Sequence, residues 1–230
     1  YAFAGSGLTS VALPSSVEFV GKGAFEGCAQ LSSVDISGAR TDSISDFLFK
    51  SCDSLKSVRL PVGVTSIGDG AFENTPIQSI DFNGAPIVSI GENAFMSTRL
   101  SKAELPSSVR KIGAGAFSRI PSLSSAVIPA ITEMGRGAFE GCSVLSSVTI
   151  ADGATVIGED AFAWRPDGLN TAKSPLKNVT IPDSVQTIGA GAFYNCSSLK
   201  EVNLKGVQTI GAAAFYASGI TGVDTSAASI

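Results

Sequence analysis

The dominant pattern along the chain is a phenylalanine that recurs at a nearly constant spacing. Successive anchors are 22 to 24 residues apart, apart from one step of 31, and almost all follow an alanine: Phe3, Phe25, Phe49, Phe72, Phe95, Phe117, Phe139, Phe162, Phe193 and Phe215. Most anchors are followed by an apolar residue and then by a period-two alternation such as Val58-Arg59-Leu60, which predicts a strand. A period of this length indicates a solenoid of stacked turns.

Each repeat has a second apolar position shortly before the next anchor, usually the isoleucine of an Ile-Gly pair such as Ile67-Gly68. Residues that tolerate positive φ follow it, such as Gly70, Asn93, Gly115 and Asp160. Each repeat is therefore predicted to contain a strand, a corner, a short second strand, a second corner and a compact turn with an inward phenylalanine. One repeat cannot bury its apolar side alone, so equivalent residues must stack into columns.

The recurring pattern Ile-Gly-x-x-Ala-Phe-x-x-Cys-x-x-Leu-x-x-Val-x-Leu-Pro-x-x-Val-x-x-Ile-Gly resembles the BspA-type (Treponema pallidum-type) leucine-rich repeat family over essentially all 230 residues. The resemblance implies a mainly β leucine-rich repeat solenoid, a right-handed coil with a parallel concave sheet, short second strands and turn segments. It also implies display on a cell surface, where several such proteins act as adhesins, and it carries over no catalytic residue.

The array has no internal linker, so we expect a single continuous domain over residues 1–230, with an insertion loop at 163–175. The chain opens at Tyr1, in the middle of a repeat, and ends where the next Ile-Gly pair would begin. We therefore expect it to be a segment of a longer repeat protein.

One candidate binding surface is the outward position of each predicted strand. It carries Asp35, Arg59, Asp81 and Glu104 among smaller residues: Ala12, Val127, Thr149, Thr180, Asn203 and Asp224. The surface is mildly acidic and lacks the aromatic residues that dominate binding hot spots. Two interpretations remain open, a solvated sheet face and a site for an electropositive protein or a carbohydrate.

A second candidate is the insertion, which holds the single tryptophan of the chain, Trp164, beside Arg165. Tyr194, in the next repeat, completes a set of residue types that are common in hot spots. Insertions between repeats often lie on the binding face. The alternative is that Trp164 folds back as a lid over its own repeat.

Composition excludes several functions. The formal charge is −4 and no run of like charges occurs, which argues against nucleic-acid binding. Mean hydropathy is +0.30, yet no apolar stretch approaches the roughly 20 residues that span a bilayer, so no direct membrane insertion is expected. Without histidine, catalysis by Ser-His-Asp or Cys-His groups is impossible. We expect no enzyme activity and no cofactor or metal.

Four cysteines fall three residues after an anchor: Cys28, Cys52, Cys142 and Cys196. Stacked side chains in one column point in parallel rather than towards each other, which favours buried thiols over disulfides.

Together these features predict a non-catalytic protein-binding or adhesion module of a surface-exposed or secreted protein, with a protein or a cell-surface glycan as partner. The alternative is a structural spacer or a building block that packs with other subunits in a large assembly.

Overall fold

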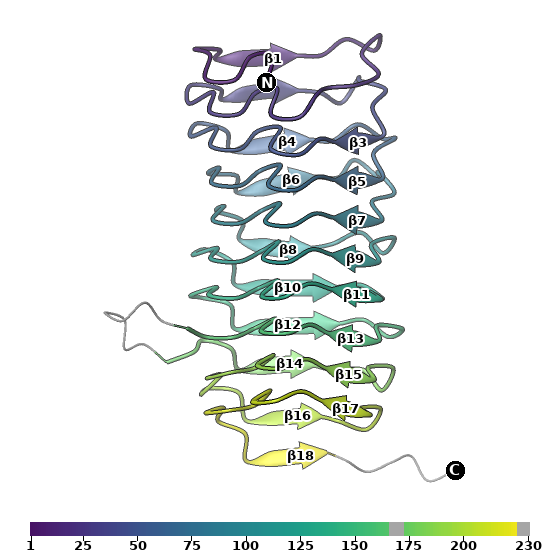
Figure 1. Cartoon of the computed structure of the whole chain (residues 1–230), viewed down its shortest axis with the longest axis vertical. Helices are drawn as coiled ribbons and strands as arrows, with labels where there is room; N and C mark the ends of the chain where they lie inside the picture. Colours follow the sequence, from purple (N-terminus) through teal and green to yellow (C-terminus); the bar gives the residue numbers. More distant parts are fainter. Residues whose placement is uncertain (166–172, 225–230) are drawn as a thin grey trace.

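The computed structural model shows a single β-solenoid, in which each repeat forms one coil stacked on the next (Figure 1). The structure describes residues 1–165 and 173–224. These residues contain strands and turns and no helix, because each repeat is too short to hold two strands and a crossover helix. The predicted solenoid is confirmed.

One side of the stack carries the longer strands, which we call the long-strand face. It is the face that the family resemblance predicts to be concave, and its strands run in parallel: β1 (Ser10–Ala12), β2 (Ser33–Asp35), β4 (Ser57–Arg59), β6 (Ser79–Asp81), β8 (Lys102–Glu104), β10 (Ser125–Ile128), β12 (Ser147–Ile150), β14 (Asn178–Thr180), β16 (Glu201–Asn203) and β18 (Gly222–Asp224).

The second side carries the two-residue strands: β3 (Ser43–Ile44), β5 (Ser66–Ile67), β7 (Ser89–Ile90), β9 (Lys111–Ile112), β11 (Glu133–Met134), β13 (Val156–Ile157), β15 (Thr187–Ile188) and β17 (Thr209–Ile210). They form one five-stranded and one three-stranded parallel sheet, so this side is bonded continuously from β3 to β11.

The long-strand face is less continuous than the sequence predicts. Its ladder keeps equivalent residues opposite each other, for example Val58 opposite Ile80. It is nevertheless divided into four sheets, β1-β2, β4-β6, β8-β10-β12-β14 and β16-β18. Backbone pairing therefore stops between β2 and β4, between β6 and β8, and between β14 and β16.

The anchors form the predicted inward ladder along the whole stack. Each ring stacks on the next, with centroids 5.1 to 5.7 Å apart and planes 4 to 18° apart. Backbone hydrogen bonds fix this spacing, since the amide of Phe72 donates to the carbonyl of Ala94 at 2.8 Å and the pattern repeats along the stack. The core is thus a set of columns with a spacing close to that of paired strands.

Two backbone requirements explain the Ile-Gly signature. A Cβ on Gly91 would lie 2.5 Å from the carboxylate and 2.7 Å from the backbone of Asp69 in the preceding turn, so only glycine fits there. Two residues before each anchor from Phe25 onwards, φ is positive, and it is 51 to 61° in Gly70, Asn93, Gly115 and Asp160, as the sequence predicts. Phe47 occupies this position with φ 55°, and its half-buried ring covers Gly70.

All four cysteines are buried and free, which confirms the predicted column of thiols. Each thiol donates a hydrogen bond to the carbonyl of the anchor in the preceding turn, as Cys52 does to Phe25 at 3.1 Å. Burial raises the pKa of Cys52, Cys142 and Cys196 to about 12, because a thiolate would lose its hydration. The thiols therefore act as small donors inside the core.

Candidate binding surfaces

The structure brings three of the four predicted residues of the long-strand face together. The Nε atom of Arg59 lies 3.2 Å from Asp81 Oδ2, and both side chains are about 60% exposed. Asp35 lies one strand further, and its pKa is lowered by the hydrogen bond from the Ser37 hydroxyl, then by the Ser37 amide and by the charge of Arg59. The predicted acidic strip is therefore partly neutralised by one central arginine.

Glu104 stands apart from these three residues, on the far side of the interruption between β6 and β8. Its carboxylate lies 3.8 Å from the ammonium group of Lys102, with exposures of 69% and 63%. Sequence analysis missed Lys102, which replaces the serine found at the first strand position in β2, β4, β6, β10 and β12. This replacement of serine by lysine is the feature of the sequence that could have identified Lys102.

Trp164 is buried between its own repeat and the preceding one. Its side chain is 6% exposed, and it borders a residual cavity of only about 10 Å³ together with Gly141, Pro175 and Leu176. Its amide donates to the carbonyl of Tyr194 at 2.9 Å. This position agrees with the lid interpretation. Residues 166–172 of the predicted insertion at 163–175 lie outside the described residues.

Arg165 lies in an ion-pair cluster beside the aromatic residue that the sequence analysis associated with it. Its Cζ atom is 4.9 Å from the centroid of the Tyr194 ring, and Nε is 3.2 Å from Glu140 Oε1. Nη2 donates to one carboxylate oxygen of Asp160, while Arg136 Nη2 lies 2.8 Å from the other. The charges of this cluster are largely satisfied within the protein.

Asp160 is the centre of that cluster and was not predicted as such. Its carboxylate is 5% exposed between two arginines. The hydrogen bond from Arg136 to Asp160 is the main reason why the pKa of Arg136 is raised, followed by the charge of Glu159. The sequence signal was an acidic residue in the column that is otherwise mostly glycine.

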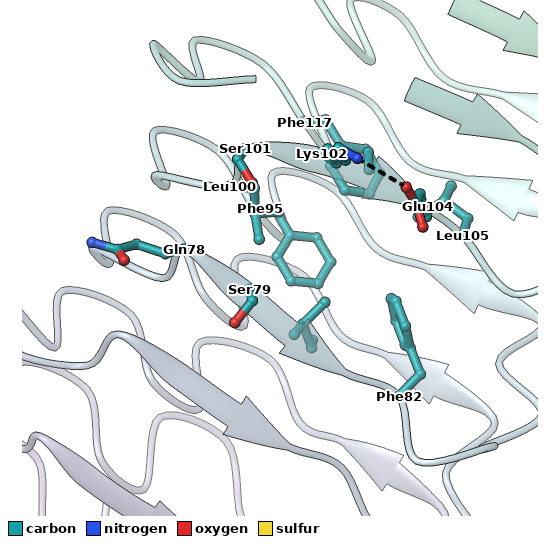
Figure 2. Close-up of a pocket in the computed structure, with 12 residues that line it drawn as sticks. Gln78, Ser79, Phe82, Phe95, Leu100, Ser101, Lys102, Glu104, Leu105 and Phe117 are labelled. Atoms are coloured by element: carbon teal, nitrogen blue, oxygen red, sulfur yellow. Dashed lines mark ion pairs between the residues drawn. The ribbon is translucent and has the colours of Figure 1, made fainter. Parts of the chain in front are cut away.

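A cavity of about 370 Å³ opens on the long-strand face between β6 and β8. Figure 2 shows Phe95 in the space between the strand that carries Ser79 and the strand that carries Lys102 and Glu104. Phe95 and Phe117 line the inner end of the cavity, Phe82 and Leu105 line its side, and Ser79 and Lys102 lie at its rim. The sequence predicted no cavity here, although one of its candidate residues, Glu104, is among the lining residues.

Comparison with known proteins identifies the family of this chain. The model of the BspA type leucine rich repeat region matches six copies, over residues 1–86, 42–167 and 171–230. The chain therefore belongs to the BspA-type leucine-rich repeat family, as its repeats predict. No curated protein sequence matches it.

Solved structures share the fold. A leucine-rich repeat protein from Bacteroides ovatus has a TM-score of 0.75 at 24% identity, over 91% of this chain and 58% of that chain. A leucine rich cell surface protein from Faecalibacterium prausnitzii has 0.51 at 24%, over 91% and 64%. The T. pallidum leucine rich repeat protein has 0.52 at 27%, over 83% and 78%. This chain thus spans little more than half of the Bacteroides protein.

Within residues 1–165 and 173–224, nothing resembles a long apolar helix that could cross a membrane. Leucine-rich repeat domains generally mediate protein interactions. The long-strand face and the insertion are therefore compared as candidate protein-binding surfaces.

Proposed function

We propose that this chain is a non-catalytic protein-binding module of a surface-exposed leucine-rich repeat protein, and that its partner contacts the long-strand face. The observation that carries the proposal is a difference in the solvent exposure of the candidate side chains. Arg59, Asp81, Lys102 and Glu104 expose 60 to 69% of their side chains, whereas Trp164 is 6% exposed.

The long-strand face also has the rigidity that a binding surface needs. Its outward residues stand on strands whose inward neighbours are core, such as Val148 at 1% exposure in β12. Val127, on β10, is 44% exposed and adds an apolar contact to the charged and hydroxyl side chains around it. Exposed charges of both signs beside an apolar residue suit a protein partner with a mixed surface.

A cell-surface or secreted location is part of the same proposal. It is supported by the fold shared with a leucine rich cell surface protein from Faecalibacterium prausnitzii. An adhesion role, with a host matrix protein or a cell-surface glycan as partner, is the kind of binding that such a location favours.

The test is binding of the purified segment to immobilised matrix proteins (fibronectin, fibrinogen and laminin) and to a glycan array. We expect protein binding that Arg59→Glu or Thr149→Arg weakens at least tenfold, because both residues project from the long-strand face. Arg165→Ala is the matched control and should bind like the parent. Loss of binding in Arg165→Ala alone would move the site to the insertion, and a segment that binds nothing would favour the spacer role.

A further inference from the structure

We propose that the cavity between β6 and β8 is an anchor pocket for one apolar side chain of an extended peptide, and that the adjacent residue of that peptide is basic. This inference deepens the proposed function, since it names the part of the partner that the long-strand face would hold.

The interruption between β6 and β8 is a local opening of the solenoid. No ladder joins these two strands, although each is bonded on its other side, β6 to β4 and β8 to β10. On the opposite side of the same turns, Ser89 of β7 still pairs with Lys111 of β9. The anchors Phe95 and Phe117 also remain 5.2 Å apart. The two turns therefore separate only at the long-strand face.

A small inward side chain beside an interrupted ladder explains the cavity. Among the described long strands, the central inward position holds valine or isoleucine except in β8 and β10, which have Ala103 and Ala126. Both neighbours of β10 are paired with it, whereas β8 is unpaired towards β6, so there Ala103 leaves space that a branched side chain would fill. Phe82 and Leu105, at the next inward position, are only half-buried, whereas Leu60 and Ile128 in the same column are 0% exposed. The pocket thus has an apolar wall and an apolar inner end.

Charge explains the second part of the proposal. If β6 and β8 continued the register of their neighbours, Asp81 would stand directly opposite Glu104. Like charges at opposed positions destabilise a strand pair. In the existing ladder Asp81 stands opposite Arg59, which is the favourable arrangement. Each of the two carboxylates has one cation nearby, Arg59 at 3.2 Å from Asp81 and Lys102 at 3.8 Å from Glu104. A cationic side chain placed between Asp81 and Glu104 would add a cation that both carboxylates share across the interruption.

Strand edges favour a peptide over other ligands. The facing edges of β6 and β8 present backbone donors and acceptors that no ladder between them uses, and an extended peptide satisfies such groups while its alternate side chains enter pockets. A residue that points into the cavity has a neighbour that points outwards, to the level of Asp81 and Glu104. The wall formed by Phe82 and Leu105 suits an apolar side chain of such a peptide.

The experiment uses random heptapeptides displayed on phage and selected on the folded 230-residue segment. We expect selected peptides to carry Leu, Ile or Phe next to Lys or Arg. A synthetic peptide of that consensus should bind Ala103→Ile at least tenfold more weakly than the parent, because isoleucine fills the pocket. Glu104→Gln should weaken binding at least threefold and reduce its dependence on salt.

Ala126→Ile is the matched control, since Ala126 occupies the same column in β10, where both neighbouring strands are paired. It should bind the peptide like the parent. Circular dichroism checks that each variant folds, and Ala103→Val replaces Ala103→Ile if the larger residue is not accepted. Selection of no peptide, selection without the apolar and basic pair, or equal affinity of the Ala103 variant would overturn the proposal.

The same variants separate this proposal from the proposed function. If a matrix protein binds the parent and loses affinity with Thr149→Arg but not with Ala103→Ile, the long-strand face is the binding surface and the pocket is not its anchor. If neither variant changes binding, both proposals are wrong.

Discussion

Replacing one central ring of the ladder tests the architecture most directly. Phe139 is 1% exposed and stacks between Phe117 at 5.1 Å and Phe162 at 5.4 Å. Phe139→Ala removes a fully buried phenyl group and leaves a cavity between turns whose backbones are held by hydrogen bonds. Collapse around the site is limited by those bonds, so we expect a loss of about 3 to 5 kcal/mol of unfolding free energy.

Urea denaturation followed by circular dichroism measures this loss. Phe19→Ala is the control, because Phe19 is 72% exposed and its truncation should change the unfolding free energy by no more than about 0.5 kcal/mol. A repeat array can lose cooperativity when one interface weakens, so the slope of the transition is compared along with its midpoint. Equal midpoints for Phe139→Ala and Phe19→Ala would refute the conclusion that the anchor rings form the stacked core.

Three further predictions concern buried polar groups. A thiol reagent should leave the native segment unmodified at pH 8, because all four thiols are buried and burial raises the pKa of Cys52, Cys142 and Cys196 to about 12. In denaturant it should titrate four thiols, and fewer than four would indicate a disulfide. The unfolded chain releases these protons near pH 9, so stability should fall as pH rises from about 9 to 12, and less so in Cys142→Ala. Asp160→Asn should cost about 2 kcal/mol, because Arg136 and Arg165 lose a charged acceptor, and Asn93 shows that asparagine accepts this positive φ. Asp46→Asn, which removes an exposed ion pair at 3.5 Å, is the control and should change stability little.

The repeat itself was readable from the sequence because each inward column is specified many times. Ten anchors, the Ile-Gly step and the thiol column reinforce one another, so a single departure does not alter the assignment. Register follows from the same redundancy, and pairs such as Val148 with Val179 across the 31-residue step were predictable. In a solenoid, local pattern and global fold point to the same contacts.

Departures from the repeat were harder to interpret because their effect depends on the neighbouring turn. Ala103 is an ordinary core residue in one repeat, and only its position beside an interrupted ladder makes it part of a pocket. Lys102 and Asp160 likewise gain their roles from partners in other positions or other turns, Glu104 at 3.8 Å and Arg136 at 2.8 Å. A one-dimensional comparison of repeats shows such residues as substitutions but does not rank them.

The two candidate surfaces differ in what binding would require of them. At the insertion, a partner would have to expose Trp164 from its packing beside Gly141 and Leu176 and break ion pairs of Arg165 with Glu140 and Asp160. Those losses oppose affinity before any new contact forms. On the long-strand face the exposed charges already lie in water and the pocket between β6 and β8 is already open. A partner there would bury apolar wall without unfolding any part of the solenoid, and for this reason the long-strand face is the stronger candidate.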